Sequence, residues 1–234
     1  MYETLTWFLK RLFCAFIRPL EFTKSLFREQ SFVYDQPLKN LDIELIVGSC
    51  KLPYVTKFIL KVEALKLILD EIKSSKYATS LKKFNIKNPY INYITLYEIH
   101  SLDEHDKGKS IYANHFHTDD TVDPSCVKFF QLPFDITISN GPMQFISKEN
   151  TALNHQKGFF RGPKLALQNN IHSYKNSTNA LFLDPRSCLH KAGVPINGFS
   201  RIMLMVQIIE SKKIESLDDL YLKQFKKEPT LLKH

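Results

Sequence analysis

The sequence has few cysteines, and they are widely spaced. Four occur in 234 residues, and no two form a Cys-x-x-Cys pair. Small secreted domains usually depend on a dense disulfide framework because their cores are small. This chain has no such framework, so we expect a reducing, cytoplasmic compartment. The four cysteines are Cys14, Cys50, Cys126 and Cys188.

No apolar run reaches the roughly 18–20 residues that span a bilayer. Near the N-terminus, Lys10, Arg11 and Arg18 interrupt the best candidate, and the same charges argue against a cleavable secretory signal. At helical spacing, residues 5–18 form a strongly apolar helix with a basic side. We interpret it as a helix packed on the domain, because Pro19 ends it early. Peripheral contact with a membrane surface is the alternative.

The sequence also lacks an internal repeat, a low-complexity tract, a glycine-rich phosphate loop and a Gly-x-Ser-x-Gly nucleophile turn. The chemistry must therefore depend on other residues. The formal charge of +8 comes from lysines and arginines spread along the whole chain. We interpret it as a solvated basic surface and expect a small-molecule substrate rather than a nucleic acid. The oligomeric state stays open.

Length and a hydrophobic content of 44% favour one domain over residues 1–234. Within it we expect a mostly helical region at 1–85, a β-rich core at 86–212 and a helical or flexible tail at 213–234. Helical spacing predicts an amphipathic helix over about 54–73. Its apolar positions are Phe58, Ile59, Val62, Leu65, Leu69 and Ile72.

After Asn88-Pro89 the pattern changes to short runs rich in β-branched and aromatic residues. Helices followed by many short strands predict a mainly β fold with flanking helices, an α+β protein with a jelly-roll (cupin-like, double-stranded β-helix) core. The polar stretch at 147–179 is long for a strand connection, and we expect it to cross the barrel mouth or act as a lid. The expected strands are 90–99, 110–119, 127–132, 143–146, 180–184 and 200–210.

Three residues could hold a metal ion. In the strand expected at 110–119, alternation points His117 and Asp119 to one face, while Asp120 points away. Two imidazoles and one carboxylate leave three adjacent positions of an octahedral ion open. A third ligand must come from a distant strand, and the strand that we expect to end at His190 offers one.

An arginine opens the last strand of the expected core. Arg201 follows His190 by eleven residues, on what we interpret as a neighbouring strand, and otherwise apolar residues follow it. A guanidinium is costly to bury alone, and its planar fork suits a carboxylate. We therefore expect Arg201 to meet an anion.

From about 110 to 207 the sequence resembles the phytanoyl-CoA dioxygenase-like family of Fe(II)/2-oxoglutarate-dependent oxygenases. The resemblance rests on the order and spacing of His117-Thr118-Asp119, Val127-Lys128-Phe129-Phe130-Gln131-Leu132, Asn140-Gly141-Pro142 and Leu189-His190-Lys191-Ala192-Gly193, followed by Arg201. It departs from the family after Ile146, where Ser147-Lys148-Glu149-Asn150 replaces the usual Pro-Gly-Ser-His. We therefore assign no fatty acyl-CoA substrate.

The resemblance implies that His117, Asp119 and His190 bind Fe(II). It also implies that Arg201 holds the far carboxylate of 2-oxoglutarate, with Thr118 as a further co-substrate contact. The implied reaction uses dioxygen, converts 2-oxoglutarate to succinate and hydroxylates an unactivated carbon of a small-molecule or lipid-like substrate. Asp119 argues against halogenation, whereas desaturation and ring formation stay open.

Two other functions compete with this interpretation. A cupin-like metal protein would use His115, His117, a nearby carboxylate and His190 without a co-substrate. A scaffold would keep the barrel without turnover. We interpret His155 and His172 as ordinary exposed residues, and the acidic segment 103–106 as a solvated hairpin tip rather than a cation site.

Overall fold

The computed structural model describes residues 28, 30–39, 46–111, 113–119, 123–168 and 170–225. The helix expected at 5–18, Asp120 and the tail beyond residue 225 lie outside these ranges. Within them, no helix combines the length and the apolar character that crossing a bilayer requires.

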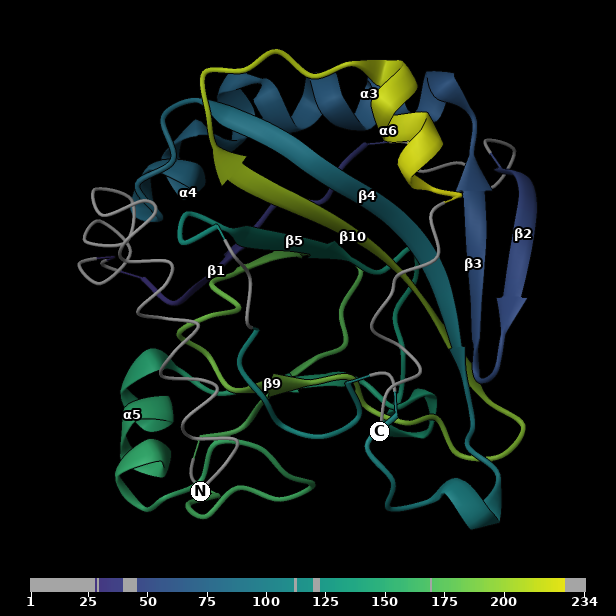
Figure 1. The fold of residues 1–234 in the computed structure, drawn as a ribbon, viewed down its shortest axis with the longest axis vertical. Helices are drawn as coiled ribbons and strands as arrows, with labels where there is room; N and C mark the ends of the chain where they lie inside the picture. Colours follow the sequence, from purple (N-terminus) through teal and green to yellow (C-terminus); the bar gives the residue numbers. More distant parts are fainter. Residues whose placement is uncertain are drawn as a thin grey trace.

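Two facing sheets form the body of the protein (Figure 1). The main sheet has the strand order β1-β8-β5-β10-β4-β3-β2, and the small sheet has the order β7-β6-β9. The main-sheet strands are β1 (Phe32–Asp35), β2 (Ile46–Leu52), β3 (Val55–Leu60), β4 (Pro89–His100), β5 (Val127–Gln131), β8 (Ala180–Leu183) and β10 (Ser200–Glu210). The small-sheet strands are β6 (Met143–Phe145), β7 (His172–Tyr174) and β9 (His190–Lys191).

The connectivity is that of a jelly roll. From β4 onward the chain alternates between the sheets: β5, β8 and β10 return to the main sheet, while β6, β7 and β9 belong to the small one. Phe116 and His117 extend the small sheet, because His117 bridges His190 on β9. The predicted fold class, a mainly β jelly-roll core with flanking helices, is confirmed.

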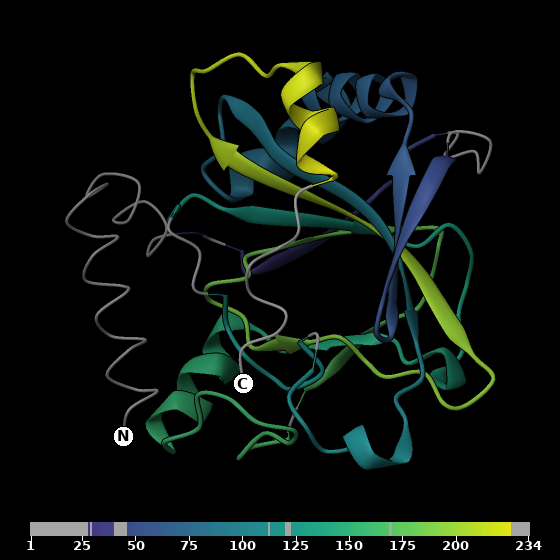
Figure 2. The ribbon, with the colours of Figure 1, turned by 45° about the vertical axis from the view of Figure 1, so that its right-hand side comes forward.

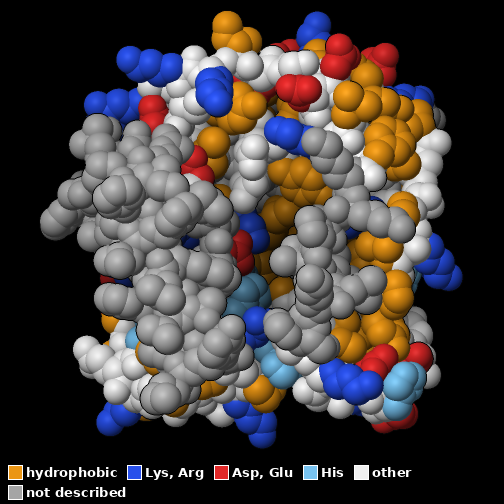
Figure 3. Space-filling view, viewed as in Figure 1, with side chains coloured by type: hydrophobic (Ala, Val, Ile, Leu, Met, Phe, Trp, Pro, Cys, Tyr) orange, Lys and Arg blue, Asp and Glu red, His pale blue; other side chains and the backbone are white. Residues whose placement is uncertain are grey.

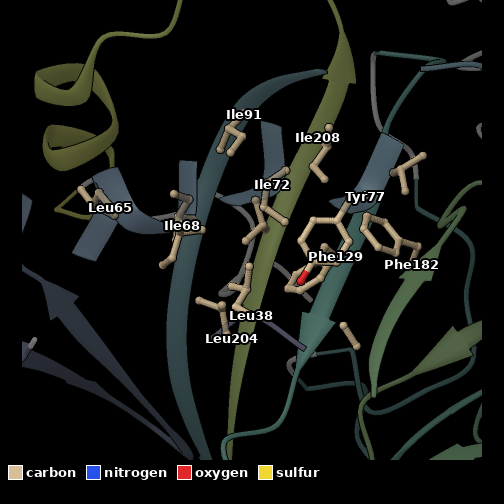
Figure 4. Packing of buried hydrophobic residues seen from close by; sticks show 14 of the residues in the cluster. Leu38, Leu65, Ile68, Ile72, Tyr77, Ile91, Phe129, Phe182, Leu204 and Ile208 are labelled. Carbon is tan, nitrogen blue, oxygen red and sulfur yellow. The ribbon is translucent and has the colours of Figure 1, made fainter. Parts of the chain in front are cut away.

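Helices cover the outer face of the main sheet. α3 (Val62–Lys73) and α6 (Leu217–Lys223) lie over β4 and β10, whereas α5 (Lys148–Gln156) lies beside the small sheet (Figures 1 and 2). α4 (Ala78–Lys83) lies toward β1, where the Ser80 hydroxyl donates to the Asp35 carboxylate. Side chains of α3 such as Ile68 and Ile72 pack on Leu204 and Ile208 of β10 and on Phe129 of β5 (Figure 4). This outer core stiffens the sheet whose inner face forms one wall of the barrel.

The helix predicted from residue 54 is wrong in its first part. Residues Val55–Leu60 form β3, which pairs with β2 and β4, and the helix begins only at Val62. Pro53 and Tyr54 make the β2–β3 turn, with Tyr54 at φ 63°. The apolar spacing of this run fits a helix, but tertiary pairing of its β-branched and aromatic residues overrides that pattern. The region expected to be mostly helical therefore contributes β1, β2 and β3.

The stretch at 147–179 is not an irregular loop throughout. It contains α5 and β7, and Thr151 and Asn154 of α5 are buried. The Asn154 side chain accepts from the Leu167 N–H at 2.9 Å and donates to its carbonyl at 3.3 Å. The polar composition did not indicate this regular structure, because side-chain amides such as that of Asn154 form hydrogen bonds within the segment. The lid stays a prediction.

Two glycines allow the connection between β9 and β10 to pack directly on the main chain of the loop before β6. A Cβ on Gly193 would lie 2.2 Å from the Pro142 carbonyl oxygen, and one on Gly141 would lie 2.3 Å from the main chain of the facing loop. The Asn140 side chain donates to the carbonyl of Ser200 at 2.8 Å. This close approach explains the Asn-Gly-Pro and Ala-Gly segments singled out in the sequence: together they fix where β10 begins.

We predict that Gly193→Ala lowers the free energy of unfolding by about 1–3 kcal/mol, because the new methyl group overlaps a main-chain carbonyl. Denaturant unfolding measures the change. Gly48→Ala is the matched control, since its Cβ would meet only Ile59 Cδ1, at an ordinary 3.8 Å. Equal stabilities of the two variants would contradict the close approach.

Candidate metal centre

The first two candidate ligands lie on a segment that only partly forms a strand. We predicted a strand over 110–119, whereas among the described residues of this segment only Phe116 and His117 make bridges. The His117 N–H donates to the His190 carbonyl at 3.0 Å, and the His190 N–H donates to the His117 carbonyl at 2.9 Å. Two residues later, the Asp119 N–H donates to the Pro185 carbonyl at 2.7 Å. Main-chain contacts therefore hold both residues against the β8–β9 connection.

His190 begins β9 and does not end the preceding strand, so that part of the prediction is wrong. β8 stops before Asp184, whose Oδ1 accepts hydrogen bonds from the Arg186 and Ser187 N–H groups at 3.1 and 3.3 Å. Its Oδ2 forms a buried ion pair with Arg28 at 2.7 Å. An aspartate readily closes such a turn. After the turn at Asp184 the chain passes from the main sheet to the small sheet, where His190 begins β9.

The three predicted ligands converge. Nε2 of His117 and Nε2 of His190 each lie 3.4 Å from Oδ1 of Asp119. One ligand atom from each residue lies within 4.8 Å of the others, and the described residues contain no second such group of three or more His, Cys, Asp or Glu. Two imidazoles and one carboxylate with three open positions form the donor set of non-haem iron(II) sites. These residues fit a divalent transition-metal ion.

Main-chain carbonyl groups orient both imidazoles. Nδ1 of His117 lies 2.8 Å from the His115 carbonyl oxygen, and Nδ1 of His190 lies 2.9 Å from that of Cys188. Because a carbonyl only accepts, Nδ1 of each neutral ring carries the proton and Nε2 keeps its lone pair. Both lone pairs then face the position next to Asp119, as metal binding requires.

Asp119 divides its oxygens between the histidines and a lysine. Oδ1 faces both imidazoles, whereas Oδ2 lies 2.5 Å from Nζ of Lys128 on β5. Burial alone would raise the pKa of the Asp119 carboxyl, but the Lys128 ammonium and the two adjacent imidazoles hold that pKa well below its usual range. Burial lowers the pKa of His190, although Asp119 opposes the shift. A carboxylate and a neutral imidazole are the forms that bind metals.

Arg201 is fully buried at the start of β10, with 0% of its surface exposed. It shares the inner face with Met203, whereas Leu204 and Ile208 pack outward, so both faces of the strand are buried as predicted. Within the described residues, none of its three guanidinium nitrogens has a hydrogen-bond partner. Burial lowers the pKa of Arg201, and the nearby Tyr97 opposes that shift. A guanidinium nevertheless keeps its proton and needs an anion.

Arg201 and His190 lie on opposite sheets and not on neighbouring strands as we predicted, since β9 belongs to the small sheet and β10 to the main one. Figure 3 shows a hollow lined by hydrophobic side chains, with basic, acidic and histidine side chains at its edge. The side chains of His117, Asp119 and Lys128 remain 18%, 14% and 17% exposed. A small molecule can therefore reach this centre from solvent.

His115 does not join the ligand group. Its carbonyl orients His117, and its ring forms a hydrogen bond with the main chain of Gly108. The ligand set of the cupin-like alternative therefore lacks one of its histidines. Thr118 is buried between the two ligands, and its contact with a co-substrate stays a prediction.

The exposed positions predicted for His155 and His172 are wrong. Both rings are half-buried and stacked, His155 on Phe160 at a centroid distance of 4.8 Å and His172 on Phe145 at 5.3 Å. Their polar neighbours in the sequence concealed this aromatic packing.

The acidic segment at 103–106 forms a largely exposed turn, as predicted, but not the tip of a hairpin, because the preceding strand β4 pairs with β3 and β10. Asp106 pairs with Lys109 at 2.6 Å and accepts a hydrogen bond from the Tyr54 hydroxyl at 2.5 Å, while Glu104 pairs with Lys107. Lysine ammonium groups therefore balance the charges of Glu104 and Asp106 locally.

Lys128 belongs to the site but was not predicted from the sequence. It lies on the inner face of β5 with Phe130, opposite Gln207 of β10. A lysine inside the apolar run Val127–Gln131 was a usable signal, because a charge on a buried strand needs a partner. The partner is Asp119, nine residues earlier and on the opposite wall.

No protein-family model matches this sequence, and no curated protein matches it. The structure is similar to SnoN, a non-heme alpha ketoglutarate dependent epimerase from nogalamycin biosynthesis, with a TM-score of 0.50, 13% identity, and coverage of 84% of this chain and 87% of that chain. HygX from Streptomyces hygroscopicus, solved with nickel, 2-oxoglutarate and hygromycin B, gives a TM-score of 0.48 at 12% identity, covering 81% and 87%. At this identity the similarity to SnoN establishes a shared fold alone, and the phytanoyl-CoA dioxygenase-like resemblance stays a prediction.

We predict that Asp119→Asn weakens Mn(II) binding at least about a hundredfold, about 2.7 kcal/mol, because it removes the charge of the carboxylate and keeps its shape. Titration calorimetry measures the affinity, and circular dichroism checks the fold. Asp103→Asn, in the exposed turn, should bind Mn(II) as the wild type does. Unchanged affinity in the Asp119 variant would refute the ligand assignment.

Proposed function

We propose that this protein is an Fe(II)- and 2-oxoglutarate-dependent oxygenase. The observation that carries the proposal is Arg201: a fully buried guanidinium with no hydrogen-bond partner among the described residues, inside the barrel that holds the His117, Asp119 and His190 group. A metal site alone leaves that charge unexplained. A dicarboxylate that reaches from the metal to the guanidinium accounts for both.

Each residue has a distinct task in this proposal. His117, His190 and Asp119 would hold iron(II) and leave three adjacent positions for the two donor oxygens of a 2-oxo acid and for dioxygen. Arg201 would bind the far carboxylate through its planar fork. Tyr97 of β4 lies opposite Met203 of β10 and packs against the inner core cluster, so it shares the inner face of the main sheet with Arg201.

Iron and 2-oxoglutarate, when bound, supply oxygen activation coupled to conversion of 2-oxoglutarate into succinate. Hydrophobic side chains line the hollow (Figure 3), so a bound substrate would lie against apolar walls. With Asp119 as the third protein ligand, no protein position is vacant for a halide, so we propose hydroxylation of a small-molecule or lipid-like substrate. SnoN and HygX, which share the fold, are themselves 2-oxoglutarate-dependent or 2-oxoglutarate-binding proteins.

We predict a visible charge-transfer band when the protein is mixed anaerobically with Fe(II) and 2-oxoglutarate, because the 2-oxo acid chelates the iron. Absorption spectroscopy reads it directly. The Asp119→Asn variant is the control and should give little or no band at equal concentrations. A cupin-like metal protein or a scaffold would show no band even in the wild type.

We predict that Arg201→Lys raises the half-saturating 2-oxoglutarate concentration at least about tenfold, about 1.4 kcal/mol, because a lysine keeps the charge and loses the two-pronged contact. Succinate formation against 2-oxoglutarate concentration, at fixed iron loading, measures it. Arg161→Lys is the matched control, since this exposed arginine contacts Ser110. An unchanged value for Arg201→Lys would count against the assignment.

A further inference from the structure

Lys128 occupies an unusual position beside the candidate metal centre. It projects from the inner face of β5, where it lies opposite Gln207 of β10 and Leu183 of β8. Its ammonium lies 2.5 Å from Oδ2 of Asp119, the carboxylate whose other oxygen faces both histidines. A metal ion held by His117, His190 and Asp119 would therefore share its one anionic ligand with a cation supplied by the protein.

The inner face of the main sheet offers no second carboxylate to relieve this competition. The registers of β4, β5, β8 and β10, all described, direct two cationic side chains inward, Lys128 and Arg201, and no Asp or Glu. The buried carboxylate of Asp184, just beyond β8, is already paired with Arg28 at 2.7 Å. A divalent cation would add two charges to a space where Asp119 only balances Lys128 and Arg201 remains uncompensated.

We propose that Lys128 competes with the metal ion for Asp119, so that the ion binds weakly until the 2-oxoglutarate dianion enters the barrel. This inference rests on the proposed function for the identity of the dianion, but the competition itself does not. Like charges that share a partly buried site repel strongly, because water screens them poorly. A dianion beside Arg201 and the ion offsets that repulsion, so each partner strengthens binding of the other by the same factor.

The first experiment measures Mn(II) alone. Lys128→Met keeps most of the length and removes the charge, and Lys128→Gln keeps a donor for Oδ2 as a second neutral variant should the methionine variant fail to fold. Both should bind Mn(II) at least about tenfold more tightly than the wild type by titration calorimetry, about 1.4 kcal/mol. Unchanged or weaker binding by a folded neutral variant overturns the proposal, since Lys128 would then only support the shape of the site.

Matched variants separate charge competition from general perturbation. Lys191→Met changes a lysine next to ligand His190, but that ammonium lies over the Phe116 ring at 4.7 Å and contacts the Pro163 carbonyl. Its Mn(II) affinity should equal that of the wild type. Lys128→Arg retains the charge and should bind Mn(II) more weakly than Lys128→Met. Tight binding by the arginine variant would overturn the role of charge.

The second experiment repeats the Mn(II) titrations with saturating 2-oxoglutarate, which Mn(II) holds without turnover. The ratio of affinities with and without 2-oxoglutarate should be at least about fivefold smaller in Lys128→Met than in the wild type. An equal ratio overturns the proposed coupling even where the proposed function stands. A wild-type protein that binds Mn(II) but shows no response to 2-oxoglutarate overturns the proposed function and the coupling together.

Discussion

The centre depends on one antiparallel bridge, the pair of main-chain hydrogen bonds between His117 and His190. Residues directly opposite each other in an antiparallel pair point their side chains to the same face. The two imidazoles therefore lie side by side, with ring centroids 4.7 Å apart. Strand alternation then returns Asp119 to the same side as His117. Two hydrogen bonds between residues far apart in the sequence thus assemble a three-ligand group that neither segment could form alone.

The cationic side chains of the interior differ in whether they have an anionic partner. Two cationic side chains already have carboxylate partners: Arg28 pairs with Asp184, and Lys128 pairs with Asp119. The Arg28 pair supports the turn that presents His190. Arg201 differs, because none of its guanidinium nitrogens has a hydrogen-bond partner among the described residues. Because an uncompensated buried charge is costly, an exception of this kind is expected where a ligand completes the structure.

The sequence was informative where one pattern dominated. The strand predicted at 200–210 matches β10, and the runs at 127–132 and 180–184 match β5 and β8 closely, because continuous apolar and β-branched residues buried on both faces fit few other structures. The alternation of side chains along the strand at 200–210 also led us to expect Arg201 inside the protein, where it is fully buried. At Val55–Leu60 the same apolar residues satisfied both helical and strand spacing, and only pairing with β2 and β4 decides between them.

Of the short strands of the small sheet, β6 matches the strand predicted at 143–146, whereas β7 and β9 were not predicted. β7 has three residues and β9 has two, too few to show a period, so the sequence could not show that His190 follows a turn at Asp184. The ion pair between Lys128 and Asp119 was hidden for a different reason. It joins the two walls of the barrel, and no local pattern encodes a contact between walls.

The ion pair between Lys128 and Asp119 also connects the two sheets. The small sheet, extended by Phe116 and His117, supplies the two histidine ligands, whereas the main sheet supplies the cations Lys128 and Arg201. Asp119 faces the histidines with Oδ1 and Lys128 with Oδ2. A metal ion held by the histidines and Asp119 would therefore also act on the charge of Lys128 on the main sheet. In the proposed function, metal binding and anion binding would be linked through these charges across the barrel.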